Sequence, residues 1–360
     1  ISFNGAPDLQ EHHFKVERFS QDYADLRHLA VISHDLDLSD DDLRYALTRR
    51  NPLRPEAERW LKGAQEKRIW DYTFGAAEGV NFEFVAFMPL RLGFFQDEDD
   101  QVRTAAAKAL DFARKHHIDS IAFILEPKPG LRIVDKIVQG VMLGAYEYTE
   151  FKDSIYPIKT MKVELLVAPG AEPEAEKIAH ERRIVCEAAN HARDIVNRPG
   201  SSLVPEGIAA HAAKVAKKHG MEFTLLRKND LKKGGHVGLL NVGAGSAHPP
   251  VMFALNYRGA RRKKVDLALI GKGVSFDTGG ISLKPWSNMW EMKGDMAGCA
   301  AVIHTMEAIA SLGLKQNVVG IVPSAENRPD AKAYLPGDII SYKNGVSVEV
   351  HSTDAEGRLI

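Results

Sequence analysis

Residues 265–280 read VDLALIGKGVSFDTGG, and this stretch decides the fold of the second half of the chain. The apolar run Val265–Ile270 has the length and composition of a buried strand. It leads into the glycine-rich segment Gly271–Gly280, which carries Lys272 and Asp277. Ligands of open α/β sheets bind beyond the carboxyl ends of strands, so both side chains are well placed for a site. The alternative is a turn in which the aspartate caps the residues that follow it.

The residues around this stretch alternate between strand-like and helix-like patterns. Apolar runs rich in β-branched residues predict strands, and segments with apolar residues at helical spacing predict helices. The pattern predicts a helix over Pro205–His219, strands over Glu222–Leu226 and Val251–Asn256, a helix over Met296–Leu312 and a strand over Asn317–Val322. This order predicts a doubly wound α/β sheet.

The amino-terminal half shows a similar alternation. We expect strands at Leu29–Ser33, Phe82–Phe87 and Ile121–Leu125, and helices at Gln101–Ala113, Val134–Tyr148 and Glu174–Val196. A chain of 360 residues suits two domains. We therefore expect one α/β domain over residues 1–170, a connecting helix over residues 171–196 and a second α/β domain over residues 197–360.

Composition limits the class of protein. Of the residues, 44% are apolar and 26% are charged, as in soluble globular proteins. The formal net charge is −1, so a nucleic-acid or membrane partner would need a local basic patch. Two cysteines are too few for a disulfide framework, and no run approaches the roughly 18 apolar residues of a membrane span. We expect a cytoplasmic protein with no membrane partner.

Further charged residues follow the predicted strands. Lys284 lies in the sequence SLKP, where a lysine is ordinarily a surface charge, and Asp295 precedes a predicted helix, where an aspartate is ordinarily an N-cap. The sequence TDAEGRL follows a predicted strand over Val346–Val350. If strand geometry continues, its Asp354, Glu356 and Arg358 share one face, as in a plain ion-pair ladder.

Taken together, these carboxylates favour a metal site. Four of them converge on strand ends of one sheet, where their repulsion requires compensating cations. Oxygen-rich ligands suit zinc, manganese, magnesium or cobalt ions. The sequence lacks the spacing of a phosphate-binding loop and the HExxH pair of common zinc proteases. We assign no role to His304 or His351.

With these residues, the stretch from Val265 to Leu359 resembles the dinuclear leucyl aminopeptidases, also called cytosol aminopeptidases. The resemblance rests on GKGVSFDTGG, SLKP, MKGDM and TDAEGRL in this order. It implies hydrolysis of the amino-terminal residue of peptides, with leucine and other apolar residues preferred. It also implies a smaller amino-terminal domain, a larger catalytic domain over residues 197–360 and a homohexamer.

The resemblance further implies which residues hold two divalent ions, manganese or zinc, with magnesium or cobalt as further possibilities. One ion would be held by Asp277, Asp354 and Glu356. The other, more exchangeable, would be held by Lys272, Asp277, Asp295 and Glu356. A hydroxide between the two ions would attack the peptide bond.

The remaining roles implied by the resemblance concern the substrate. Lys284 would polarise the scissile carbonyl group, and Arg358 would hold a bicarbonate ion that acts as the general base. Met292 would form a wall of the pocket for the first side chain, and Asp295 would lie at the substrate's amino end.

Two departures from the family pattern open an alternative. Ser352 stands where the family usually has asparagine, and the chain stops at Ile360, whereas the family continues by something over a hundred residues. The alternative is a catalytically impaired relative with a metal-binding, assembly or DNA-binding role. Basic runs that include Arg227, Lys228 and Arg261–Lys264 suggest DNA, but such runs are usually solvated loops, and nucleic acid is not the expected partner.

Overall fold

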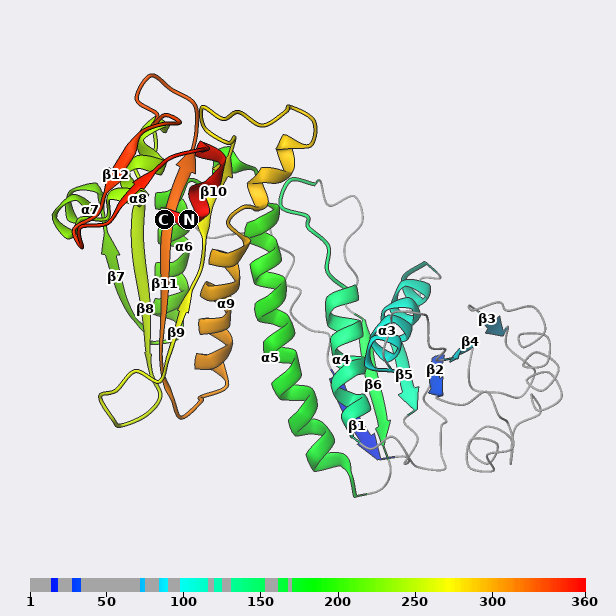
Figure 1. Ribbon diagram of the computed structural model, residues 1–360. Coiled ribbons are helices and arrows are strands. Elements are labelled where there is room, and N and C mark those ends of the chain that lie inside the picture. Colours follow the sequence, from blue (N-terminus) through cyan, green and yellow to red (C-terminus); the bar gives the residue numbers. More distant parts are fainter. Residues whose placement is uncertain are drawn as a thin grey trace, which may run out of the picture. The chain divides into compact units, whose positions relative to one another are not determined.

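The computed structural model describes residues 14–18, 28–33, 72–74, 84–89, 98–115, 120–124, 131–152, 161–167 and 170–360 (Figure 1). The chain divides into two compact units, Ile1–Cys186 and Glu187–Ile360. The long helix α5, Glu172–Asn197, contains the boundary between them. Both units combine a sheet with helices, so the predicted α/β class is confirmed.

The first unit contains a six-stranded sheet of order β1-β6-β5-β2-β4-β3. Its strands are β1 Phe14–Arg18, β2 His28–Ser33, β3 Tyr72–Phe74, β4 Phe84–Pro89, β5 Ser120–Ile124 and β6 Lys162–Val167. All pairs are parallel except β3 with β4. The ends of two predicted strands, at residues 82–83 and 125, lie outside the described residues.

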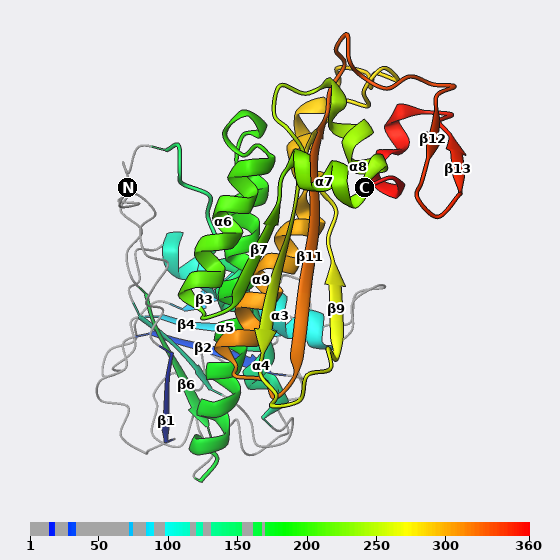
Figure 2. The ribbon, with the colours of Figure 1, turned by 90° about the vertical axis from the view of Figure 1, so that its left-hand side faces the viewer.

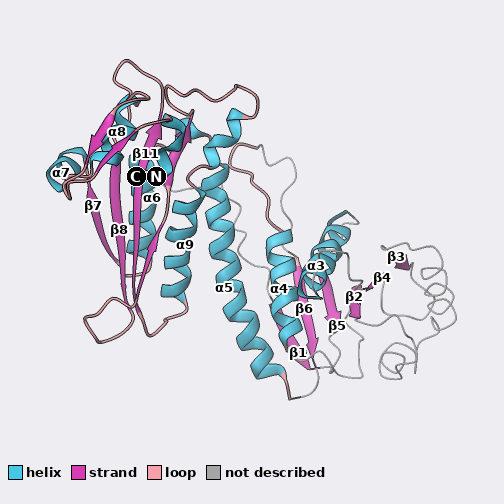
Figure 3. Cartoon of the chain, viewed as in Figure 1, coloured by secondary structure: helices cyan, strands magenta, loops and turns pink. Residues whose placement is uncertain are grey.

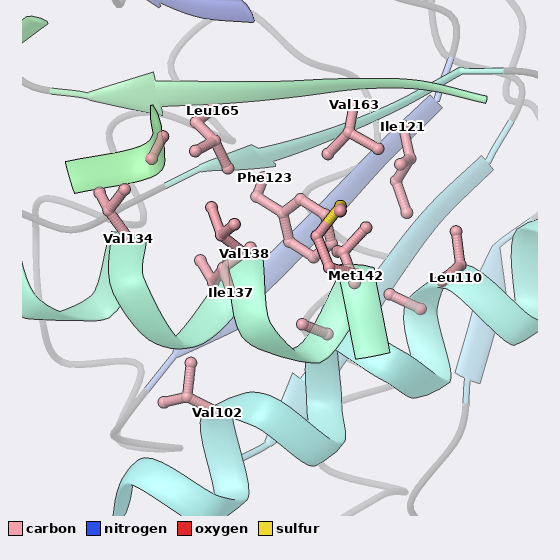
Figure 4. Packing of buried hydrophobic residues seen from close by; sticks show 14 of the residues in the cluster. Val102, Leu110, Ile121, Phe123, Val134, Ile137, Val138, Met142, Val163 and Leu165 are labelled. Atoms are coloured by element: carbon pink, nitrogen blue, oxygen red, sulfur yellow. The ribbon is translucent and has the colours of Figure 1, made fainter. Parts of the chain in front are cut away.

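Two helices, α3 Glu98–Lys115 and α4 Arg132–Gly144, supply one side of this unit's core. Ile137 and Val138 of α4 pack with Phe123 of β5 and Leu165 of β6 in a buried apolar cluster (Figure 4). Helix α4 is confirmed but ends before the predicted Tyr148.

The second unit contains a five-stranded mixed sheet. Its strands are β7 Glu222–Leu226, β8 Val251–Arg258, β9 Leu267–Ile270, β10 Gly273–Asp277 and β11 Asn317–Asn327. The order is β10-β11-β8-β7, and β9 also pairs with β11. Strand β8 runs antiparallel to both of its neighbours. The sheet is therefore mixed rather than wholly parallel: Leu226 pairs with Met252, so the β7–β8 connection stays at one end of the sheet.

Helices lie on both faces of this sheet (Figures 2 and 3). Helices α6 Pro205–Lys218 and α9 Ala297–Ser311 pack against one face, where Phe253 and Leu255 of β8 are buried. The short helices α7 Lys228–Gly234 and α8 Val237–Val242 form a second cluster with Met252. The alternation of β8 side chains between the two clusters is the ordinary geometry of a strand.

Strand β11 runs past its predicted end at Val322 to Asn327. Proline ordinarily interrupts a central strand because it has no N–H to donate. Here β9 pairs with β11 only up to Ile321, and β10 pairs with it from Ser324, so Pro323 falls between the two partners. The extension brings Asn327 opposite Asp277.

The chain turns sharply at its carboxyl end. Strand β13, Ser347–Glu349, pairs antiparallel with β12, Ile339–Ser341, and a 3₁₀ helix then covers Thr353–Arg358. The expectation that strand geometry continues through this segment is wrong. The hydroxyl of Ser352 accepts a hydrogen bond from the backbone N–H of Asp354, which starts a helical turn instead.

Three further 3₁₀ helices cover Gly200–Ser202, Gly243–Gly245 and Met289–Gly294. Among the described residues, we find no helix with both the length and the apolar content that a bilayer span requires.

Candidate metal centre

Three carboxylates meet at the end of strand β10. Asp277 is the last residue of that strand, and Asp354 and Glu356 lie in the carboxyl-terminal 3₁₀ helix. One carboxylate oxygen of each lies within 4.8 Å of the others. Asp277 and Glu356 are buried, whereas Asp354 is exposed. The structure thus brings together three of the residues that the sequence singled out.

Lys272 lies at the break between β9 and β10 and points at this cluster. Its Nζ lies 2.7 Å from Oε1 of Glu356 and 2.9 Å from Oδ1 of Asp295. The backbone packs tightly here, because a Cβ on Gly271 would lie 2.5 Å from the carbonyl oxygen of Gly298 at the start of α9. Burial opposes the charge, but the two carboxylates raise the pKa of Lys272 above its ordinary value.

Lys284 pairs with the other carboxylates. Its Nζ lies 3.0 Å from Oδ2 of Asp277 and donates a hydrogen bond to Asp354. Partial burial opposes the charge, yet these partners raise the pKa of Lys284 well above its ordinary value. Lys284 is therefore not a solvated surface charge in this structure.

Asp295 does not cap helix α9, so the N-cap interpretation is wrong. Its backbone ends the 3₁₀ helix Met289–Gly294, and α9 begins at Ala297 with Met296 as its N-cap residue and no side-chain cap. The carboxylate instead faces Lys272, and burial, partly offset by that lysine, raises the pKa of Asp295. The aspartate belongs to the cluster.

The turn after β10 requires two glycines. Gly279 and Gly280 have φ angles of 85° and 66°, which a residue with a Cβ rarely adopts. The backbone N–H of Gly279 donates to Oδ1 of Asp277 over 2.9 Å, so the capped turn considered from the sequence is present. It coexists with the contact of Asp277 to Lys284. A carboxylate has two oxygens and serves both.

The structure adds two polar residues that the sequence interpretation missed. Asn327 donates from Nδ2 to Oδ1 of Asp277 over 2.8 Å and to the carbonyl oxygen of Thr353 over 2.9 Å. The hydroxyl of Tyr334 donates to the same carbonyl oxygen over 2.8 Å. Burial, reinforced by Glu356 and the two aspartates, raises the pKa of this phenol. If the predicted strand had extended beyond Val322 to Asn327, the sequence would have indicated Asn327 as a polar residue at a strand end.

Two residues proposed from the sequence lie at the margin of the centre. Arg358 ends the 3₁₀ helix as an exposed side chain and pairs with no carboxylate among the described residues. Met292 is partly exposed in the 3₁₀ helix before Asp295. The structure does not bring either into hydrogen-bond or ion-pair contact with the carboxylates.

The donor set fits divalent cations. Two ammonium groups lie between the carboxylates and supply positive charge there. Oε2 of Glu356 is buried and has no hydrogen-bond partner among the described residues. Such an acceptor is costly to leave unpaired, and a metal ion would satisfy it. Carboxylate oxygens suit zinc, manganese or magnesium, and Lys272 would add an amine nitrogen once the ion displaces its proton.

The sequence of this region is similar to known proteins. Residues 190–360 match the cytosol aminopeptidase family, catalytic domain. A probable cytosol aminopeptidase of Geotalea uraniireducens is 39% identical over 266 residues, which cover 72% of this chain and 54% of that protein. One of Syntrophotalea carbinolica is 38% identical over 326 residues, which cover 86% and 66%. The chain spans about half the length of several curated relatives that it matches.

The fold is also similar to a solved structure. The bottromycin maturation enzyme BotP, in complex with Mn, superposes with a TM-score of 0.73 at 26% sequence identity. The match covers 93% of this chain and 67% of BotP.

Proposed function

Because this chain belongs to the cytosol aminopeptidase family, we propose that the protein is a metal-dependent aminopeptidase that removes the amino-terminal residue of peptides. The observation that carries the proposal is the convergence of Asp277, Asp354 and Glu356, whose carboxylate oxygens lie within 4.8 Å of one another. The Lys272–Asp295 pair adjoins them through Glu356.

We propose that these residues hold two divalent ions, manganese or zinc. Asp277 and Glu356 would be shared by both ions, with Asp354 on one, and Lys272 and Asp295 on the other. The chemistry that two such ions supply when bound is activation of a water molecule and polarisation of a carbonyl group. Asn327 would hold Asp277 in place by the hydrogen bond to Oδ1.

Lys284 is the residue that we propose to stabilise the developing oxyanion. Its ammonium group lies at the edge of the carboxylate cluster, in contact with Asp277 and Asp354. The raised pKa keeps it charged at neutral pH. A fixed positive charge at this position would favour negative charge on the scissile carbonyl oxygen.

Arg358 and Met292 complete the proposed site. The planar guanidinium of Arg358 suits bidentate binding of a bicarbonate ion, which supplies a proton acceptor. Met292, partly exposed beside Asp295, would contact the first side chain of the substrate and favour leucine and other apolar residues.

The proposal extends to organisation. Residues 197–360 would form the catalytic domain, residues 171–196 the connecting helix and residues 1–170 the smaller domain. The assembled enzyme would be a cytoplasmic homohexamer.

The test is hydrolysis of leucine p-nitroanilide by the full-length gene product with manganese or zinc added. We expect metal-dependent turnover that is lost in Asp354→Ala and in Lys284→Ala, while Lys315→Ala, an exposed lysine after α9, retains it. Metal bound without turnover would reject the peptidase and favour the catalytically impaired relative.

A further inference from the structure

A second cluster of metal-ligating side chains surrounds Glu307. This glutamate lies on helix α9 and is buried. Three imidazoles face its carboxylate: His191 from α5, His304 from α9 and His219 from the carboxyl end of α6. All four residues belong to the second compact unit. None takes part in the peptidase centre described above.

The spacing of the donor atoms of His191, His304 and Glu307 suits one metal ion. Oε2 of Glu307 lies 2.6 Å from Nδ1 of His304 and 3.1 Å from Nδ1 of His191. Oε1 lies 3.4 Å from Nε2 of His219. Ligand atoms around a tetrahedral ion with bonds of about 2.0–2.1 Å lie roughly 3.3 Å apart. The ligand atoms of His191, His304 and Glu307 also lie within 4.8 Å of one another, whereas His219 approaches the group only through its contact with Glu307.

One imidazole nitrogen in the cluster has no hydrogen bond. Nε2 of His219 is buried and has no hydrogen-bond partner among the described residues, although it faces Glu307. The other nitrogen, Nδ1, lies 3.4 Å from the hydroxyl of Ser311. A buried donor or acceptor is rarely left unpaired. This nitrogen therefore points to a partner from outside the protein, such as a metal ion.

His211 hydrogen-bonds to His304 and would orient it as a metal ligand. Nε2 of His211 lies 3.1 Å from Nε2 of His304. When one ring nitrogen of a histidine binds a metal, the other usually donates its proton to a neighbouring acceptor, and His211 offers that acceptor. His304 can then present the lone pair of Nδ1 to the ion.

The competing account is a metal-free ion-pair cluster. Burial opposes ionisation of Glu307, but hydrogen bonds from His191 and His304 hold its pKa well below the ordinary value, so the carboxylate is charged. Lys218 also lies 3.7 Å from Oε1, although its side chain is largely exposed. These contacts balance the charge, but they leave Nε2 of His219 without a hydrogen bond among the described residues, at 3.4 Å from Oε1 of Glu307.

We propose that His191, His219, His304 and Glu307 bind one divalent transition-metal ion of the zinc class, which ties helices α5, α6 and α9 together. His191, His304 and Glu307 would supply three ligands, and a shift of the His219 ring toward the ion would complete a closed tetrahedral set, as in structural rather than catalytic zinc sites. The ion would displace Lys218 toward solvent and would carry no catalytic role.

The test uses cobalt(II), whose visible absorption is strong in tetrahedral nitrogen-rich sites and weak in oxygen-rich sites of higher coordination. The full chain is loaded with cobalt, and the spectrum is compared with that of the His191→Asn/His219→Asn variant. Both histidines lie at the edge of the cluster, which limits damage to the core. His248→Asn, at an exposed histidine, is the matched control.

We expect a strong tetrahedral band in the unaltered protein and in the control, and its loss in the double variant. Zinc should compete for this site, and the double variant should bind zinc more weakly by over about 100-fold. A loss of this size exceeds the usual effect of removing a residue that only hydrogen-bonds to a metal ligand. Circular dichroism establishes that the double variant is folded. Absence of the band from the unaltered protein, or its persistence in a folded double variant, would leave the ion-pair cluster as the correct account.

Discussion

Nζ of Lys272 lies 2.7 Å from Oε1 of Glu356, so a residue at a break between two strands pairs with one in the last turn of the chain. The glutamate side chain is almost fully buried, whereas the lysine is about one-third exposed. This pair links the sheet to the carboxyl-terminal 3₁₀ helix.

Glu356→Gln should therefore destabilise the metal-free protein. The amide keeps the shape of the side chain but removes the negative charge that faces Lys272, and we expect a loss of about 1.5–3 kcal/mol in the free energy of unfolding. Urea unfolding with a chelator present measures it. Glu349→Gln, at an exposed glutamate on β13, should change stability by no more than about 0.5 kcal/mol. Equal effects of the two substitutions would contradict the pairing.

Metal removal should lower the thermal stability of the protein. A ligand that binds only the folded state at about 100 times its Kd adds roughly 2.7 kcal/mol. We expect manganese to raise the Tm of the unaltered protein and to leave that of Asp277→Asn/Asp354→Asn unchanged, as differential scanning calorimetry can measure. Manganese avoids the histidine cluster because it prefers oxygen ligands. If manganese raised the Tm of the double variant as much as that of the unaltered protein, the ions would bind outside this carboxylate cluster.

Asn327→Ala should weaken metal binding although Asn327 is not a ligand. Its amide orients Asp277 and also holds the carbonyl oxygen of Thr353. Loss of such a partner typically costs about 10–100-fold in metal affinity. Titration with manganese measures this, and Asn229→Ala on the exposed side of α7 is the control. An unchanged affinity in Asn327→Ala would show that Asp277 needs no support.

Gly271→Ala should destabilise the protein by about 1–3 kcal/mol, because the new Cβ would lie 2.5 Å from the backbone oxygen of Gly298. Gly207→Ala in helix α6 should have the opposite effect on stability. Its Cβ would meet neighbours only at 4.0 Å, so the higher helix propensity of alanine should stabilise the protein by up to about 1 kcal/mol. Chemical unfolding compares the two, and the same sign for both would contradict the close approach.

Local patterns predicted much of the second unit. The strand Glu222–Leu226 has its predicted bounds, and helices α6 and α9 differ from their predicted ranges by one residue at one or both ends. Apolar periodicity determines such elements because each buries one face. The sequence also predicts that the acidic residues converge, and the structure brings Asp277, Asp354 and Glu356 within 4.8 Å of one another.

Long-range pairing accounts for what the sequence did not predict. The predicted strand ends at Val322, and the change of partner from β9 to β10 explains how Pro323 lies inside β11. The direction of β8 depends on the course of the β7–β8 connection, which local periodicity does not encode. The carboxylate of Asp295 could cap a helix or face a lysine, and the position of Lys272 decides between them. The roles of Arg358 and Met292 stay predictions.

The two lysines in the centre have a consequence for how the protein acquires its ions. Lys272 and Lys284 each bridge a pair of carboxylates, so the folded chain carries its own counter-ions when metal is absent. Metal loading would then replace the charge of the two lysines: Lys272 would lose its proton, since only a neutral amine binds a metal ion, and Lys284 would release the carboxylates to the ions.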